Sequence, residues 1–246
     1  MSHSFGKFCF DAESLVKKET LEGFMHELFK QSNDPSALIP YHDKIPNVDD
    51  DKKINAPKYY GAGVEFLSEC FFEEYGREYN LTGIKSYNDE EIVRKDGGVD
   101  QEARSIKQKI YTNRANTKSQ PNSPIFIQVK GTVNPTKVFE TNDGSRIMNF
   151  FGHAQGLARV AGQSYSARYI LFTTGNKMHW VLDNNTFKLI EVINYFDIKK
   201  RVNGDRIFWN RMREKFGLIA LDLPSGPIDP EFKSVTVEIE QNSCRC

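Results

Sequence analysis

The residues with the clearest capacity for chemistry in this chain are Asp100, Gln128 and Lys130. Asp100 comes shortly after a Gly-Gly pair, which lets the backbone turn tightly before an extended stretch. Residues 125–130 form a β-branched and aromatic run typical of a strand, so Gln128 and Lys130 share one face of it. An acid, an amide and a lysine at one side of a sheet are unusual, because sheet faces normally bury apolar groups.

These residue types suit metal-assisted hydrolysis of a phosphodiester bond. Mg²⁺ prefers hard oxygen ligands and is usually held by one or two carboxylates together with substrate phosphate. Asp100 would be the principal ligand, and the side-chain oxygen of Gln128 or the backbone carbonyl of Val129 would supply another. Lys130 would hold or help to deprotonate the attacking water and offset the charge that develops on the phosphoryl group.

The order of these residues resembles that of the PD-(D/E)XK nuclease superfamily and, within it, the Mrr-like restriction endonucleases. The family places an aspartate after a Gly-Gly turn and Gln-x-Lys on the next strand, matched here by Asp100, Gln128 and Lys130. Members also carry a glutamate on the preceding helix, where Glu65 falls in this chain. The resemblance implies a catalytic role for all four residues, and Glu65, Asp100, Gln128 and Val129 as the ligands of Mg²⁺, for which Mn²⁺ can substitute.

The resemblance covers about residues 60–200 and implies a definite fold. We expect an α/β protein with a three-layer α/β/α restriction-endonuclease-like core, a mixed central sheet, and additions at both ends. The predicted parts are residues 1–58, a helical extension and linker; 59–200, the nuclease-like core; and 201–246, a helix and strand packed on the core.

Residues 101–123 separate the two motifs and concentrate positive charge. The segment has five basic residues against Glu102 alone, a net charge of +4. With few large apolar side chains it should be a surface flap, mobile without ligand, that grips a phosphate backbone. A solubilising hairpin with no ligand is the alternative. The basic residues are Arg104, Lys107, Lys109, Arg114 and Lys118.

Helical spacing of apolar residues predicts helices over residues 62–75 and 145–162. The first carries Glu65, which would otherwise be an ordinary solvated acid. On the second, Gln155 and Arg159 are four residues apart on one face and could reach phosphate. The alternative for this pair is a polar outer face without a ligand.

Strands are predicted over residues 81–87, 91–94, 125–130 and 168–175. Within the third of them, Ile127 and Val129 should point into the core. A strand, a helix and a second strand over residues 125–174 favour a partly parallel sheet. Prolines and an acidic run indicate that residues 31–60 are a long connection after a helix at 20–30, with room for a short helix inside it. Residues 205–216 are predicted to be a terminal helix with a basic rim.

Composition excludes several classes of protein. The 246 residues hold 33 basic and 33 acidic side chains, so the chain is not a uniformly basic nucleic-acid binder. No run of about eighteen apolar residues and no secretory signal are present, so we expect a cytoplasmic protein without a membrane span. The cysteines lack zinc-site spacing, and no glycine-rich loop for a nucleotide cofactor is evident.

The leading hypothesis is therefore a Mg²⁺-dependent endonuclease that hydrolyses DNA, in restriction or phage defence. The alternative is an inactive nuclease-like module that binds nucleic acid, or a subunit of a larger DNA-processing complex. An unrelated α/β scaffold, with Gln128 and Lys130 facing bulk water, is a third hypothesis. Cutting both strands of DNA would favour a two-fold homodimer.

Overall fold

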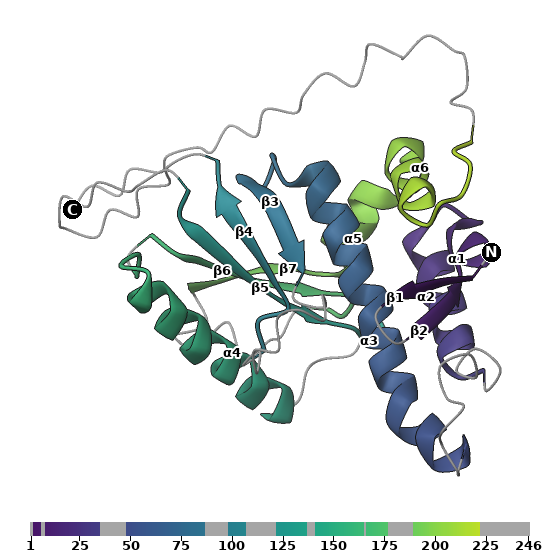
Figure 1. Ribbon diagram of the computed structural model, residues 1–246, viewed down its shortest axis with the longest axis horizontal. Coiled ribbons are helices and arrows are strands. Elements are labelled where there is room, and N and C mark those ends of the chain that lie inside the picture. The colour runs from purple at the N-terminus through teal and green to yellow at the C-terminus, as the bar shows by residue number, and fades with distance from the viewer. Residues whose placement is uncertain are drawn as a thin grey trace, which may run out of the picture.

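A five-stranded mixed sheet forms the centre of the protein, and helices flank it (Figure 1). The computed structural model describes residues 2–5, 8–34, 48–86, 98–106, 122–136, 141–164, 166–176 and 189–221. The elements are β1 (Ser2–Phe5), β2 (Phe8–Asp11), α1 (Ala12–Val16), α2 (Leu21–Ser32), α3 (Val48–Tyr75), β3 (Leu81–Ser86), β4 (Gln101–Ser105), β5 (Pro124–Lys130), α4 (Thr141–Val160), β6 (Arg168–Thr173), β7 (Ile190–Ile193), α5 (Tyr195–Val202) and α6 (Arg206–Lys215). The chain is an α/β protein, as predicted.

The strands of the main sheet lie in the order β3-β4-β5-β6-β7. Neighbours among β3, β4 and β5 are antiparallel, whereas β5–β6 and β6–β7 are parallel. Parallel neighbours need a crossover connection, and α4 provides it between β5 and β6. The predicted strand–helix–strand unit and partly parallel sheet are therefore confirmed.

The two faces of the sheet are covered by different helices. Ile127 and Val129 of β5 belong to the core cluster that includes the buried side chains of α3. Phe126 and Gln128 alternate with these two residues along the strand and so lie on its other face. Phe126 belongs to the core cluster formed with α4. The prediction that Ile127 and Val129 point into the core is confirmed, and the second face of β5 is buried as well. No helix among the described residues is long and apolar enough to cross a membrane.

Helix α3 begins at Val48, fourteen positions before the predicted start at residue 62. The prediction of a connection through residue 60, with at most a short helix, was wrong for residues 48–60, because Pro57 and the acidic run are usual signs of irregular structure. The helix instead continues through Pro57, at the cost of one intrahelical hydrogen bond. The boundary predicted at residue 58 thus falls inside a single helix.

The prediction that residues 101–123 lie wholly on the surface was also wrong. Residues 101–105 are strand β4, paired with β3 on one side and β5 on the other. Gln101 and Ala103 are buried because β4 has a paired strand on each side. Their small or amide side chains fit into this buried strand, which carries no large apolar group. Residues 107–121 lie outside the described part of the chain, as do the predicted strand 91–94 and the end of the chain from 222.

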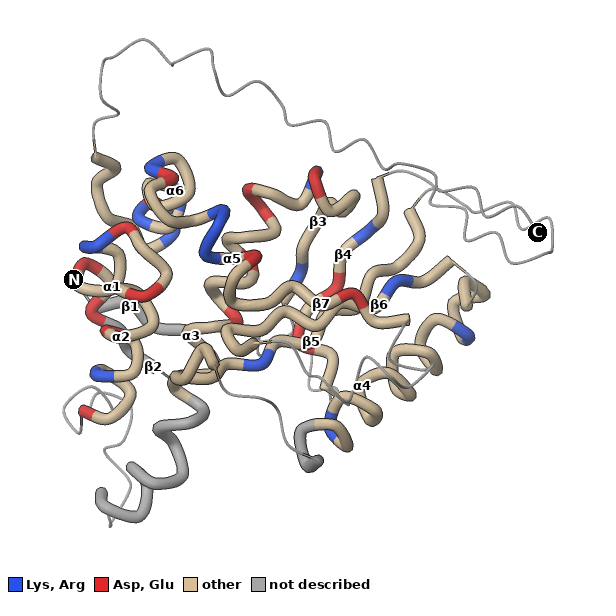
Figure 2. Tube along the Cα trace, turned by 180° about the vertical axis from the view of Figure 1, so that it is seen from behind, with Lys and Arg blue, Asp and Glu red and all other residues tan. Residues whose placement is uncertain are grey.

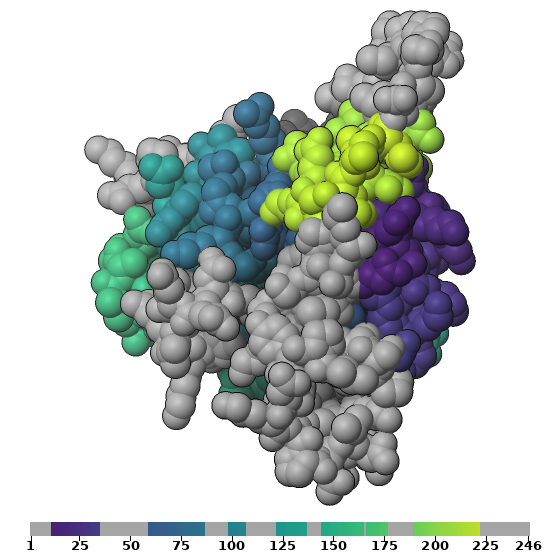
Figure 3. All heavy atoms as spheres, turned by 45° about the vertical axis from the view of Figure 1, so that its right-hand side comes forward, coloured from purple at the N-terminus to yellow at the C-terminus, as the bar shows by residue number. Residues whose placement is uncertain are grey.

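The N-terminal and C-terminal helices pack together against α3. Figure 3 shows the α1–α2 region in purple directly beside α6 in yellow-green. The Trp209 ring of α6 is fully buried, 6.3 Å from the Phe24 ring of α2, and its Nε1 donates to the Val202 carbonyl at 2.7 Å. The predicted helix at 205–216 is confirmed. Strand β7 and helix α5 were not predicted, although Asn194 and Asp197 form a capping box, a sequence signal for a helix start.

Much of the positive charge of α5 and α6 is paired with glutamates outside these two helices. Each of five basic residues on these helices lies within ion-pair distance of a glutamate. The pairs are Lys199–Glu22, Arg201–Glu78, Arg206–Glu19, Arg211–Glu74, and Lys215 with both Glu69 and Glu73. The basic rim of α6 thus contributes to the packing of the helices.

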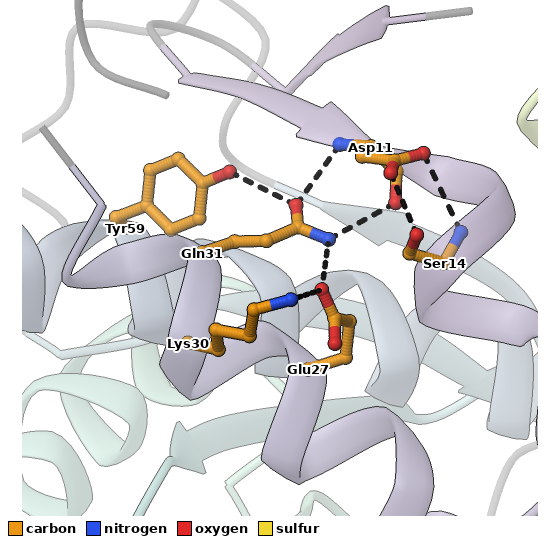
Figure 4. Close-up of polar contacts among 6 residues, drawn as sticks. All are labelled: Asp11, Ser14, Glu27, Lys30, Gln31 and Tyr59. Carbon is orange, nitrogen blue, oxygen red and sulfur yellow. Dashed lines mark hydrogen bonds and ion pairs between the residues drawn. The ribbon is translucent and has the colours of Figure 1, made fainter. Parts of the chain in front are cut away.

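An amide of α2 fixes the turn from β2 into α1 (Figure 4). Gln31 Oε1 accepts from the Asp11 backbone N–H at 2.9 Å, and Gln31 Nε2 donates to the Asp11 carbonyl at 3.1 Å. The Tyr59 hydroxyl of α3 donates to the same Oε1 at 3.4 Å. Gln31 therefore joins the N-terminal turn to two helices through one buried side chain.

Glu22 should make the helical assembly sensitive to acid. Partial burial raises the pKa of Glu22, but hydrogen bonds from Lys199, Asn203 and Tyr195 outweigh it and lower the pKa from 4.5 to about 2. The stabilisation is complete above the ordinary pKa of 4.5 and is lost as pH falls towards 2. We expect Glu22→Gln to flatten the dependence of Tm on pH in this window, while Glu214→Gln, at an exposed site, leaves it unchanged. Equal slopes in wild type and Glu22→Gln would contradict this role.

Candidate active site

Asp100 stands where β4 begins and is tied to β5 by two hydrogen bonds. Its backbone N–H donates to the Ile127 carbonyl at 3.0 Å. Its Oδ2 accepts from the backbone N–H of Val129 at 2.6 Å. The carboxylate is therefore held against the residue that precedes Lys130, although 29 positions separate Asp100 and Val129 in the sequence.

Gln128 places an unpartnered oxygen inside the protein. The residue is 1 % exposed, and its Oε1 has no hydrogen-bond partner among the residues that the structure describes. It shares the α4 side of β5 with Phe126. A buried polar atom without a partner costs about 1–3 kcal/mol, so such an atom in a native fold calls for an explanation, such as an ion or water that supplies the contact. Gln128 does not face bulk water, in contrast to what the unrelated-scaffold hypothesis predicts.

Gly98 makes room for the Gln128 amide. Its φ of +87° lies in the region that favours glycine, and a Cβ there would come within 2.9 Å of Gln128 Nε2. The same Cβ would be 3.4 Å from Phe150 Cβ of α4. The glycine turn, the amide and the middle of α4 are therefore packed against each other.

Lys130 ends β5 with a fixed backbone. Its carbonyl accepts from the Thr173 hydroxyl at 2.9 Å and from the Thr174 backbone N–H at 3.3 Å. Its half-buried side chain forms no ion pair within the part of the chain that the structure describes. The ammonium group is thus available to a ligand while the backbone that carries it is held in place.

A hydroxyl network continues this support past the end of the strand. Thr174 Oγ1 donates to the Thr132 carbonyl at 2.9 Å and accepts from the Thr132 N–H at 2.8 Å. The Tyr60 hydroxyl of α3 donates to the same carbonyl at 3.1 Å, and burial raises the pKa of Tyr60, which keeps it protonated. Sequence reasoning missed this network. Its only signal was the Thr-Thr pair at the end of the predicted strand 168–175.

Glu65 lies near the start of β4 but on the other face of the sheet from Gln128. Its backbone carbonyl accepts from Gln101 Nε2 at 2.8 Å, and Gln101 Oε1 accepts from the Ser68 hydroxyl at 2.9 Å. The half-buried Glu65 is therefore held beside the residue that follows Asp100. The structure joins Asp100 to Val129, the residue between Gln128 and Lys130, and places Glu65 on the helix that covers the opposite face of β5 from Gln128.

The predicted nucleic-acid contacts divide between described and undescribed residues. Arg104 is exposed on β4, and Gln155 and Arg159 are exposed on α4. The remaining predicted contacts, Lys107, Lys109, Arg114 and Lys118, lie outside the described residues.

The donor set fits a hard divalent cation. The Asp100 carboxylate, the Gln128 amide oxygen and nearby backbone carbonyls are all oxygen donors, the kind that Mg²⁺ and Mn²⁺ prefer. Within the described ranges no group of three or more His, Cys, Asp or Glu side chains could hold a metal. A cation here would therefore depend on one carboxylate, an amide oxygen and water, a set compatible with Mg²⁺, which keeps several waters.

The contact between Gly98 and Gln128 leads to a testable prediction. Gly98→Ala should destabilise the protein by at least ~1 kcal/mol through its positive φ, and it should also displace the Gln128 amide. Gly83→Ala is the matched control, because Gly83 has a φ of +65° but nothing within 4 Å of an added Cβ. We expect both variants to lose Tm, Gly98→Ala more because of its contact with Gln128, and only Gly98→Ala to lose metal-dependent activity. Equal metal-dependent activities of Gly98→Ala and Gly83→Ala would show that the position of the Gln128 amide does not affect activity.

Comparisons of the chain with protein-family models, with curated proteins and with solved structures found no match.

Proposed function

We propose that the protein is a Mg²⁺-dependent endonuclease that hydrolyses DNA phosphodiester bonds at Asp100, Gln128 and Lys130. The observation that carries the proposal is the buried oxygen of Gln128, which has no hydrogen-bond partner among the described residues. Gln128 is the neighbour in sequence of Val129, whose N–H binds the carboxylate of Asp100. An oxygen in this state is stabilised by a cation, which supplies the missing interaction.

The order of elements supports the same proposal. A long helix, three antiparallel strands, a second helix and a parallel strand follow one another as α3, β3–β5, α4 and β6. This is the order implied by the resemblance to PD-(D/E)XK nucleases. A restriction-endonuclease-like core is accordingly part of the proposal, with β7, α5 and α6 added after it.

Each residue of the site has a distinct task in this mechanism. Bound Mg²⁺ would polarise the scissile phosphate and activate a water molecule. Asp100 and Gln128 Oε1 would hold the cation, with the carboxylate oriented by its hydrogen bond from the Val129 N–H. Lys130 would orient the attacking water and stabilise the added negative charge, with its backbone fixed by Thr173 and Thr174.

A non-cutting nucleic-acid-binding module is the second candidate. It is favoured by the bond from the Val129 N–H to Asp100, because that bond gives the carboxylate a structural task independent of catalysis. A module of this kind would keep Asp100 without turnover.

The test is incubation of the full chain with supercoiled plasmid in Mg²⁺, in Mn²⁺ and in EDTA. Nicked or linear product that depends on the metal and is absent from an Asp100→Asn preparation supports the endonuclease. Parallel reactions with single-stranded DNA and RNA define the substrate. Binding of DNA without cleavage in either metal would favour the second candidate.

A further inference from the structure

The two helices that cover the sheet carry charge of opposite sign. Over residues 59–75, α3 has four glutamates and no basic residue. Over residues 144–160, α4 has Arg146 and Arg159 and no acidic residue. Figure 2 shows this contrast, with blue but no red along the described part of α4. A polyanion would therefore meet attraction on the α4 side.

The positive charge of α4 differs from that of α5 and α6 in being unused by the fold. Three glutamates of α3 pair with Arg211 and Lys215 of α6. In contrast, neither Arg146 nor Arg159 forms an ion pair with any described residue, and both are exposed. In a chain of zero net charge, these arginines thus give the outer surface of α4 a positive electrostatic potential.

The outer surface of α4 also has two glycines, which carry no side chain, in its middle. Gly152 and Gly156 are exposed, and a Cβ added to either would meet nothing within 4 Å. Glycine inside a helix is less favourable than alanine, and here no internal packing explains it. The absence of side chains at these two positions lets another backbone approach the helix closely.

The inner surface of α4 places this face next to the candidate site. Phe150, buried halfway between the two arginines, packs against the position of Gly98, two residues before Asp100. Arg146 and Arg159 are thirteen positions apart, about 20 Å along the helix. Since each nucleotide of a strand of DNA rises about 3.4 Å along the duplex axis, the arginines span roughly six nucleotides.

We propose that the outer face of α4, with Arg146 and Arg159 at either end of Gly152 and Gly156, holds the sugar-phosphate backbone of the nucleic acid. The proposal rests on the function proposed above and identifies the surface that positions the substrate. Charge complementarity identifies the occupant, since residues 144–160 of α4 include no acidic residue and neither arginine forms an ion pair with a described residue. His153, Gln155 and Asn149 supply exposed polar groups between them.

The experiment measures binding without cleavage, in the full chain carrying Asp100→Asn and in EDTA. A fluorescent duplex and a single strand are titrated between about 50 and 200 mM salt. We expect Arg146→Gln with Arg159→Gln to reduce the salt slope by about 0.9 per lost phosphate contact for the duplex. Gly152→Ala with Gly156→Ala should raise Tm, because alanine favours the helix, yet weaken binding. Lys200→Gln is the control for loss of a positive charge, because Lys200 is exposed on α5, which packs on α2. It should change neither the DNA affinity nor its salt slope.

Each outcome decides the proposal. Unchanged affinity and slope in both α4 variants, or no binding to either probe by the parent chain, overturns it. A change of equal size in Lys200→Gln also overturns it. Self-association that is lost in the glycine variant, with DNA affinity unchanged, assigns the face to a second copy of the chain and overturns it. Loss of binding in the α4 variants, with no plasmid cleavage by the wild type, supports this surface and refutes the nuclease.

Discussion

Replacing Asp100 by asparagine is expected to abolish Mg²⁺-dependent DNA cleavage while leaving the fold and DNA binding intact. Asparagine keeps an oxygen that can accept from the Val129 N–H, now held at 2.6 Å by the carboxylate, but loses the negative charge that a cation requires. Loss of one preorganised charged group at a reacting centre commonly costs about 10²–10³ in rate. The measurement is the rate of plasmid nicking in Mg²⁺, with Tm and DNA affinity measured on the same preparations.

Asp100→Ala provides the comparison that separates the two tasks of this carboxylate. Alanine removes both the charge and the acceptor for the Val129 N–H, so the protein should also lose about 1–3 kcal/mol of stability. Equal inactivity in the two variants, with a lower Tm only in Asp100→Ala, is the expected pattern. Cleavage by Asp100→Asn at the wild-type rate would show that the Asp100 carboxylate is not the metal ligand.

Replacing Lys130 by alanine is expected to lower the rate of cleavage by at least ~10². The backbone at this position is fixed by Thr173 and Thr174, so loss of the side chain should leave the strand in place. The rate should be measured in a single turnover with DNA saturating, so that weaker binding does not contribute. Lys85→Ala, at an exposed position of β3, is the matched loss of one positive charge.

The two possible roles of Lys130 give different kinetics. A group that stabilises charge in the transition state lowers the saturated rate and leaves the affinity nearly unchanged. A mere phosphate contact weakens binding, flattens the salt dependence and leaves the saturated rate unchanged. The second result would assign Lys130 to substrate binding and leave the attacking water to be positioned by another group.

The elements with strong local patterns could be predicted from the sequence, and those that depend on neighbours could not. Strands β5 and β6 are continuous apolar runs, and α4 repeats its apolar residues at helical spacing. Strand β4, with the sequence QEARS, is polar, and only its pairing with β3 and β5 explains its burial.

The candidate site follows the same rule. The spacing of Gln128 and Lys130 defines their shared face, because alternation along a strand is a local property. The bond from Val129 to Asp100 and the threonine support of Lys130 join positions 29 and 43 residues apart, so no local pattern contains them. The unpartnered state of Gln128 Oε1 depends on α4 and on the turn at Gly98, and only the folded chain reveals it.

The packing of the first helices on the last ones has a consequence for how the chain folds during synthesis. The N-terminus of α2 is completed by Asn203, whose Oδ1 accepts from the Leu21 N–H across 182 positions. At a ribosomal rate of roughly 5–20 residues per second, α2 emerges roughly ten to forty seconds before its partner. Throughout that interval Leu21, Phe24 and Leu28 lack the surface of α5 and α6 that later helps to cover them. Slower translation would therefore lengthen the time for which these apolar side chains stay exposed in the nascent chain.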